Sequence, residues 1–386
     1  MTQLIATEAD GMGESIRSAP RRPSVAVVGG GYGGIVVASG LDDIADLVLV
    51  EPKDAFVHNV ASLRALVDPS WLPRIFLPYD HLLTNGRVFR DRAVQVDAGR
   101  VLLASGGELA ADYIVLATGS TYPFPAKSDV NDTEVAYERY RATNAELAAS
   151  ERVLLLGAGA VGIELAGEVK AVWPEKQVTI VDIADDVLGP RFMPELRAEL
   201  RRQLEELGVV LILGSPLRDP PSTAPGVHGT FSVTTEDGRV MTADLWFRCY
   251  GLRPGTDYLS GSLATARLAS GEVEVTPELR VAGHDAVFAI GDMTALDSKG
   301  AGVAGRQAEL VCRNLRALIT GEGPQESYTS RGPAIVVPIG PEGGAGQLPG
   351  QAGIADRPFV AAAKGRDMMV DRFRVKLGLT AASPRV

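Results

Sequence analysis

Short apolar runs separated by glycine-rich turns dominate the chain from residue 23 onward. Residues 24–28 (SVAVV) form an apolar run, a glycine-rich turn and a helix-forming stretch follow at once, and residues 46–50 (DLVLV) form a second run. Apolar strands without alternation are typical of a parallel sheet that is covered on both faces. The same order recurs over residues 152–182. The pattern therefore predicts two βαβ units in one chain, an internal duplication.

The stretches around these two units predict smaller elements. Residues 87–119 and 208–254 alternate short β-like runs with turn signals, which predicts meanders. Residues 271–292 predict a further pair of strands, and residues 301–319 predict a helix. The polar, glycine- and proline-containing stretch 321–333 predicts a linker. Beyond this linker we expect a strand, a glycine loop and a helix-like segment that begins near Phe359.

The first turn contains a G-x-G-x-x-G motif at Gly29, Gly31 and Gly34, and Glu51 ends the next strand. In such a motif the first glycine makes the tight turn and the second lets a pyrophosphate approach the backbone. The third lets helix and strand pack closely. The pyrophosphate is expected at the helix N-terminus, and Glu51 would accept hydrogen bonds from a ribose. In a chain with 43 glycines the motif alone is a weak signal, but the flanking strand, helix and acid make it specific.

The second unit repeats the motif at Gly157, Gly159 and Gly162, and Asp182 ends the strand that follows. An acid in this place binds a ribose 2′-hydroxyl and repels a 2′-phosphate, which favours NADH over NADPH. Arg191 lies nearby in the sequence and could reach a phosphate, so NADPH stays open. Two sites predict two dinucleotides, and the simplest pair is a tightly held flavin, FAD, with an exchanging nicotinamide.

Charge and cysteine content exclude several classes of function. The formal net charge of −10 argues against a nucleic-acid partner, because affinity for phosphates comes from clustered basic residues. Cys249 and Cys312 are the only cysteines, so we expect neither a disulfide framework nor a metal site. We also expect no secretory signal and no membrane-spanning run. A cytoplasmic small-molecule enzyme is predicted, whose membrane contact, where present, is peripheral and on the inner face.

Three further segments order the two units by resemblance. Residues 112–120 (DYIVLATGS) and 287–292 (VFAIGD) resemble the fingerprints of the two-dinucleotide flavoprotein superfamily that includes glutathione reductase. Residues 249–254 (CYGLRP) resemble the superfamily's motif at the exit from the NAD domain. The resemblance implies that the first unit holds FAD and the second NAD(P)H. It adds Thr118, Gly119, Gly291 and Asp292 as FAD-binding positions, with Asp292 on the ribitol chain, and Gly251 on the NAD(P)H side.

The fold class that follows is α/β, with two Rossmann-like, three-layer dinucleotide-binding domains and a small C-terminal capping domain. The NAD domain is inserted in the FAD domain. The predicted parts are a disordered extension (1–22), the FAD-binding domain (23–120 and 255–325), the NAD(P)H-binding domain (121–254) and the C-terminal domain (326–386).

The cysteines narrow the chemistry further. Disulfide reductases of this superfamily need a cysteine pair near the flavin, and Cys249 and Cys312 lack that spacing, so we interpret both as buried hydrophobes. Five segments instead resemble the apoptosis-inducing-factor-like group with the ferroptosis suppressor proteins, which are NAD(P)H:quinone reductases related to type II NADH dehydrogenases. These segments are residues 53–65 (KDAFVHNVASLRA), 157–170 (GAGAVGIELAGEVK), 174–181 (PEKQVTIV), 339–348 (IGPEGGAGQL) and 363–367 (AKGRD).

This resemblance implies roles for individual residues. Glu164 would contact the nicotinamide end of NADH, although a glutamate near a helix N-terminus also interacts with the helix dipole. His58 would pack beside the flavin, and a structural histidine is the equal alternative. Lys364 would lie close to the flavin ring, whereas most lysines are solvated. Lys53, Asn59 and Arg64 are added as FAD-binding positions.

The C-terminal segment, residues 364–386, is basic within an acidic protein and is interleaved with apolar residues. Such a segment could lie on an anionic membrane and open a path for a lipid-tailed quinone, or it could simply cap the protein. We predict a FAD-dependent NADH:quinone oxidoreductase. The alternatives are a reductase of a small iron–sulfur protein and a redox-controlled binding protein like the apoptosis-inducing factors, in which a homodimer could form.

Overall fold

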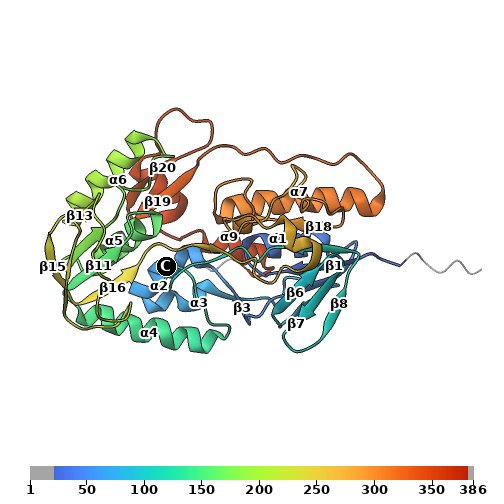
Figure 1. Ribbon diagram of the computed structural model, residues 1–386, viewed down its shortest axis with the longest axis horizontal. Coiled ribbons are helices and arrows are strands. Elements are labelled where there is room, and N and C mark those ends of the chain that lie inside the picture. The colour runs from blue at the N-terminus through green and yellow to red at the C-terminus, as the bar shows by residue number, and fades with distance from the viewer. Residues whose placement is uncertain (1–20, 381–386) are drawn as a thin grey trace, which may run out of the picture.

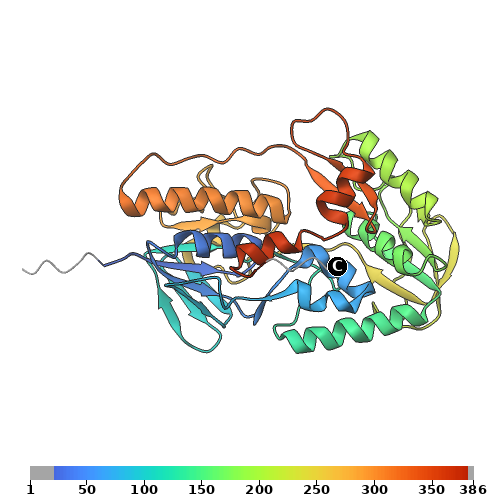
Figure 2. The same ribbon diagram turned by 180° about the vertical axis from the view of Figure 1, so that it is seen from behind.

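The computed structural model describes residues 21–380, and residues 1–20 and 381–386 lie outside the described part. The extension predicted for residues 1–22 is therefore outside it except for Arg21 and Arg22, and so is the end of the basic tail. The described chain forms two lobes, each built on its own parallel sheet, and the C-terminal elements lie across them (Figures 1 and 2).

The first lobe contains a five-stranded parallel sheet in the order β18-β9-β1-β2-β5. Its strands are β1 (Ser24–Val28), β2 (Asp46–Val50), β5 (Arg87–Phe89), β9 (Tyr113–Leu116) and β18 (Val287–Ala289). The helices α1 (Tyr32–Leu41) and α7 (Ala301–Thr320) cover one face, and an antiparallel sheet of β6 (Ala93–Asp97), β7 (Arg100–Leu103) and β8 (Glu108–Ala110) covers the other. Alternate residues of β1 serve the two layers, because successive strand side chains point to opposite faces.

The second lobe contains a four-stranded parallel sheet in the order β13-β12-β11-β16. Its strands are β11 (Arg152–Leu156), β12 (Gln177–Val181), β13 (Val210–Ile212) and β16 (Leu245–Arg248). One face packs on α4 (Thr133–Ala149), α5 (Ala160–Val172) and α6 (Pro194–Glu206), and the other on the hairpin β14 (Phe231–Thr234) and β15 (Val240–Ala243). Both lobes are therefore three-layered.

Two short strands join the lobes. The chain leaves the first lobe at β10 (Ser120–Thr121) and returns at β17 (Arg253–Pro254), and these strands pair antiparallel. The second lobe is thus inserted in the first, and the predicted limits of the inserted domain lie in these strands. The remaining short elements are β3 (Ala55–Val57), β4 (Phe76–Pro78), α2 (Ser62–Val67), α3 (Leu72–Ile75) and 3-10 turns at Asn59–Ala61, Pro69–Trp71, Gly261–Ala266 and Gly291–Met293.

The C-terminal part begins with an irregular stretch over residues 321–333, which runs from α7 back towards the second lobe (Figure 1). The hairpin β19 (Ile335–Ile339) and β20 (Gly343–Gln347) then packs on α5 and α6. The chain continues through α8 (Arg357–Val360), a π-helical turn (Ala361–Gly365) and α9 (Val370–Lys376).

Two sequence-based expectations need correction. The segment after Phe359 is not one helix, because Met368 and Met369 adopt left-handed conformations with φ of 52° and 60° and separate the π turn from α9. The pair of strands expected over residues 271–292 is reduced to β18, and the rest makes isolated bridges such as Val275 to Val281. Within residues 21–380, no helix has the length and apolar character needed to cross a membrane.

Candidate functional site

The glycines of the first turn have three different surroundings. Gly29 has a φ of +104°, and a Cβ there would lie 2.7 Å from the Ala117 carbonyl oxygen. A Cβ on Gly34 would overlap the Gly29 carbonyl oxygen, so only glycine allows α1 to pack this closely on β1. At Gly31, in contrast, a Cβ would meet no heavy atom of the described residues within 4 Å. The open space lies where the sequence predicts a pyrophosphate, at the N-terminus of α1.

The second turn repeats this arrangement. Gly157 has a φ of +117°, and a Cβ there would lie 2.8 Å from the Cys249 carbonyl oxygen. A Cβ on Gly162 would overlap the Gly157 carbonyl oxygen, whereas one on Gly159 would meet no described heavy atom within 4 Å. The two cradles, at the N-termini of α1 and α5, therefore fit one dinucleotide each.

In each βαβ unit, the acid that follows the second strand accepts a hydrogen bond from the glycine turn of that unit. The Gly30 N–H donates to Glu51 Oε2 at 2.6 Å, and the Lys53 N–H donates to Oε1 at 2.9 Å. In the second lobe, the Ala158 N–H donates to Asp182 Oδ2 at 2.5 Å. Each carboxylate oxygen keeps a lone pair, so both acids can also accept a ribose hydroxyl. Lys53 is half-buried, and desolvation lowers the pKa of its ammonium.

Asp292 lies at the start of the turn before α7, in a cluster of donors. Ser120 Oγ donates to its Oδ2 at 2.6 Å, the Gly300 N–H donates to Oδ1 at 2.9 Å, and Lys127 Nζ lies 3.3 Å from Oδ2. Gly291 has a φ of 76° and donates its N–H to Gln307 Oε1 at 2.6 Å. These contacts with protein groups fix the orientation of the Asp292 carboxylate.

Lys127 was missed by the sequence reasoning, because it matches no motif and follows the crossover strand by several residues. Thr118 lies in the same region, and its hydroxyl donates to the Gly255 carbonyl at 2.7 Å. It thereby joins the outgoing and returning strands. Gly119 and Gly251 have φ of 62° and 104°, which only glycine adopts readily.

Glu164 and Lys364, predicted near the nicotinamide and the flavin ring, form an ion pair. Lys364 Nζ lies 2.8 Å from Glu164 Oε1 and also donates to the Val336 carbonyl at 3.2 Å. The Lys364 side chain is only 13% exposed and the Glu164 side chain 12%, so neither is a solvated surface residue. Burial raises the pKa of Glu164 above its ordinary value, and the Lys364 charge opposes this rise. The pair joins α5 of the second lobe to the C-terminal segment.

Arg64 and Glu168 form a second buried ion pair, one helical turn further along α5. Arg64 Nη2 donates to Glu168 Oε1 at 2.8 Å and to the Gly365 carbonyl at 2.9 Å. Burial raises the pKa of Glu168, and Arg64 opposes this rise. The contacts of Arg64 within the described chain are with protein groups, so its predicted role in FAD binding stays a prediction. Glu168 could have been found from its spacing to Glu164, since residues four apart share a helix face.

His58 is completely buried in an aromatic cluster. Its ring lies 4.8 Å from that of Phe373, and Tyr32 and Phe56 complete the cluster. Desolvation lowers the pKa of His58 to about 4, so the ring is neutral at pH 7. Its neighbour Asn59 holds a buried Oδ1 with no hydrogen-bond partner in the described chain, which fits a ligand that donates a hydrogen bond. Tyr32, within the first glycine turn, was not singled out from the sequence.

Within the described part of the C-terminal segment, residues 364–380, most of the large apolar side chains face the protein. Met368, Phe373 and Leu377 are buried against the first lobe or the core between the lobes, while Val375 is 63% exposed. This arrangement is the one expected of a capping segment. Both cysteines are buried as well, and burial raises the pKa of each thiol to about 12.

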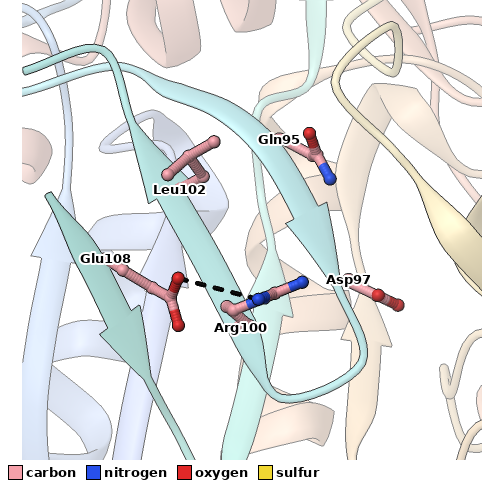
Figure 3. A pocket seen from close by; sticks show the side chains of 5 residues that line it. All are labelled: Gln95, Asp97, Arg100, Leu102 and Glu108. Carbon is pink, nitrogen blue, oxygen red and sulfur yellow. Dashed lines mark ion pairs between the residues drawn. The ribbon is translucent and has the colours of Figure 1, made fainter. Parts of the chain in front are cut away.

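A hollow of about 100 Å³ lies on the meander of the first lobe (Figure 3). Its lining residues are Gln95, Asp97, Arg100, Leu102 and Glu108, and Arg100 Nη1 lies 3.7 Å from Glu108 Oε2. Both partners of this ion pair are about half exposed. The hollow is too small for a dinucleotide and is lined by none of the predicted site residues.

Comparison with known proteins gives concordant results. The model of the family "pyridine nucleotide-disulphide oxidoreductase" matches residues 23–310. Ferroptosis suppressor protein 1 of Taeniopygia guttata is 32% identical over 366 residues, which cover 93% of this chain and 97% of the relative. The Homo sapiens protein of the same name is 30% identical and covers 90% of this chain and 93% of its own. Apoptosis-inducing factor homolog B of Dictyostelium discoideum is 29% identical, covering 84% and 89%.

Solved structures share the architecture. The sulfide:quinone oxidoreductase of Aquifex aeolicus superposes with a TM-score of 0.72 at 16% identity, over 94% of this chain and 93% of that one. The reductase in the putidaredoxin reductase–putidaredoxin complex gives 0.66 at 21% identity, over 84% and 81%. At these identities the similarity establishes the fold alone. The predicted fold class, with two Rossmann-like domains, is confirmed.

Proposed function

Because the chain belongs to the pyridine nucleotide-disulphide oxidoreductase family, we propose that it is an NADH:quinone oxidoreductase that contains FAD. The suspected place among the apoptosis-inducing-factor-like proteins and ferroptosis suppressor proteins is confirmed by the relatives. The family establishes a FAD-dependent oxidoreductase that uses a nicotinamide nucleotide. In the proposed reaction, NADH, one proton and a quinone give NAD⁺ and a quinol. Bound FAD would accept a hydride from NADH and would then pass two electrons to the quinone.

The observation that carries the proposal is the pair of glycine cradles, one on each lobe. Each has free space at its middle glycine, and each turn donates a backbone hydrogen bond to the acid at the end of the following strand. A chain with a single dinucleotide needs one such turn. Two cradles in two domains joined by a short crossover favour the direct passage of hydride between two bound dinucleotides.

Glu164 and Lys364 would orient the reacting end of the nicotinamide. A buried carboxylate can accept a hydrogen bond from the carboxamide of a nicotinamide, and Lys364 neutralises its charge in a site from which water is largely excluded. Asp182 would favour NADH, because its carboxylate, which accepts from the Ala158 N–H of the second glycine turn, would meet the ribose and repel a 2′-phosphate.

The quinone is proposed by elimination and by resemblance. A disulfide or sulfide relay requires a reactive thiolate, and both thiols of this chain are buried with raised pKa values. The proposed reaction therefore passes electrons from the flavin directly to an external acceptor. The segments that resemble NAD(P)H:quinone reductases favour a quinone in this role.

An anaerobic titration tests the proposal. The purified yellow protein is mixed with NADH, or separately with NADPH, and a short-tailed ubiquinone or menaquinone is then added. Rapid bleaching by NADH, slower bleaching by NADPH and recovery of the oxidised spectrum with quinone are expected. A reduced flavin that no quinone reoxidises would overturn the acceptor, and a colourless protein without FAD would overturn both half-reactions.

A further inference from the structure

Two carbonyl groups of the segment 364–369 accept hydrogen bonds from side chains that lie some 300 residues earlier in the chain. Arg64 Nη2 donates to the Gly365 carbonyl at 2.9 Å, and His58 Nε2 lies 2.7 Å from the Met368 carbonyl. The first contact lies at the end of the π turn, and the second lies at the first of the left-handed residues Met368 and Met369. The segment is therefore fastened at two points by side chains from residues 58–64.

The hydrogen-bond chain through His58 has one consistent direction. A carbonyl only accepts, so Nε2 of His58 carries the proton and donates to the Met368 oxygen. Nδ1 then accepts from the hydroxyl of Tyr32 at 3.1 Å, and this hydroxyl accepts from the Val60 N–H at 3.0 Å. All three groups are satisfied with a neutral imidazole, which is the form that a completely buried ring prefers.

The contact made by Arg64 is fixed in the same way. Its guanidinium also pairs with Glu168 and lies 5.0 Å from the centre of the Trp71 ring. With 8% exposure it has little freedom to swing away from the Gly365 carbonyl. Glu168 and Glu164 lie on the same face of α5, so Arg64 sets the position of this helix and of the C-terminal segment together.

The backbone of the segment needs such support. Non-glycine residues adopt left-handed conformations only where their surroundings hold them there. Met368 and Met369 do so in succession, with φ of 52° and 60°. Lys364 lies four residues before Met368, in the π turn. Its ammonium forms the ion pair with Glu164 on α5 of the second lobe.

We propose that His58 and Arg64 are positioning residues, which fix the backbone of residues 364–369 and thereby hold Lys364 against Glu164. Neither residue then needs to touch a cofactor. The proposal deepens the proposed function and rests on it in one respect: the Glu164–Lys364 pair must orient the nicotinamide. A shift of this pair by about 1 Å would slow hydride transfer by up to about a hundredfold, because transfer depends steeply on orientation.

The test compares two substitutions of His58 in the full-length, FAD-loaded protein. His58→Phe fits the aromatic cluster and removes the donor to Met368, whereas His58→Gln keeps an amide donor that reaches the same carbonyl. Arg64→Lys keeps a charge for Glu168 and removes the second arm to Gly365. Arg366→Ala is the matched control, since this side chain lies in the same segment but forms an exposed ion pair with Glu342.

Two readouts are needed. The first is hydrogen–deuterium exchange of the segment, above all of the Met368 amide, which donates to the Lys364 carbonyl at 2.8 Å. The second is the limiting rate of flavin reduction by NADH in anaerobic stopped flow, together with the FAD content. In His58→Phe and Arg64→Lys we expect the amides of the segment to exchange faster. We also expect the bound flavin to be reduced by NADH at least about tenfold more slowly, with full FAD content. We expect His58→Gln to recover most of the amide protection and most of the reduction rate. Arg366→Ala should match the parent protein in both readouts.

The outcomes separate the two proposals. A slow His58→Phe variant with unchanged exchange, or one that loses FAD, would show that His58 acts on a cofactor and would overturn positioning. Faster exchange with an unchanged rate would also overturn it. If NADH fails to reduce the parent protein, the proposed function fails, while the exchange data still decide whether these two side chains hold the segment.

Discussion

Gly31 and Gly159 offer a sharp test of which dinucleotide binds where. In both cradles an added Cβ meets no described heavy atom within 4 Å. Both residues precede a helix with ordinary dihedral angles, φ −76° for Gly31 and φ −74° for Gly159, which alanine adopts without strain. Gly31→Ala and Gly159→Ala should therefore fold normally, and the new methyl group should occupy the place of a phosphate.

The magnitudes follow from the local geometry. Replacing glycine by alanine at a compatible position stabilises a protein by about 0.4–1 kcal/mol through the unfolded state. Alanine is a poorer N-cap than glycine, which offsets part of this gain. The free energy of unfolding should thus change by less than about 1 kcal/mol. A phosphate displaced from the helix N-terminus loses a hydrogen bond to a charged group, worth about 1.5–3 kcal/mol. This weakens binding by a factor of about 10 to 150.

The assay measures three quantities on each variant: the thermal midpoint, the FAD content, and the Kd of NAD⁺ by calorimetry, which avoids turnover. Gly31→Ala should lose FAD, and Gly159→Ala should keep FAD and bind NAD⁺ more weakly. Gly34→Ala is the contrasting control, because its Cβ would overlap the Gly29 carbonyl and should destabilise the fold itself.

A crossed result would refute the reasoning. If Gly159→Ala lost FAD and kept its affinity for NAD⁺, the order of the two domains would be reversed. Unchanged binding in both variants would show that these turns hold no dinucleotide phosphate.

Three further predictions follow from the acids and the buried charges. Asp182→Asn keeps one acceptor for the glycine turn and removes the charge that would face a 2′-phosphate in the proposed site, so kcat/KM for NADPH should rise about tenfold relative to NADH in steady-state assays. Glu168→Ala should cost about 3–5 kcal/mol in urea unfolding, because it leaves the Arg64 charge buried without its partner; replacing both by Met should recover most of this loss. The pKa of His58 is lowered from 6.5 to about 4, so the unfolded state binds its proton first as the pH falls. Stability should therefore fall by about 1.4 kcal/mol per pH unit between these values, and His58→Phe should lack this part of the slope in melts at about pH 7 and 5.

The parts of the site that the sequence predicts are those set by local rules. A glycine with positive φ, a glycine against a carbonyl and an acid at a strand end each depend on a few neighbouring residues, so Gly29, Gly34 and Glu51 can be assigned from the sequence alone. The resemblance placed Glu164 and Lys364 near the reacting groups. It did not pair them, because the contact joins residues 200 positions apart and depends on how the C-terminal segment docks.

The docking itself has no sequence signal. Nothing in the composition of the segment indicates a π turn or left-handed methionines, since Met368 and Met369 favour a helix by propensity. Tertiary contacts override this propensity, and they are made by His58 and Arg64, which their motif marked only as neighbours of the flavin. Side chains that act through distant backbone carbonyls leave no spacing pattern that periodicity could reveal.

The same docking decides how the C-terminal segment can be studied. A membrane-lying helix would present its apolar side chains to lipid, but Phe373 and Leu377 are buried against the first lobe, and Val375 is the exposed exception. Truncation before Lys364 would remove the cation that faces Glu164 and would leave this carboxylate buried without its partner. Loss of the proposed quinone activity after truncation would therefore report on the cap and on the proposed nicotinamide site together. Only changes to exposed residues such as Val375 and Arg372 can separate a path for the acceptor from the cap that the structure shows.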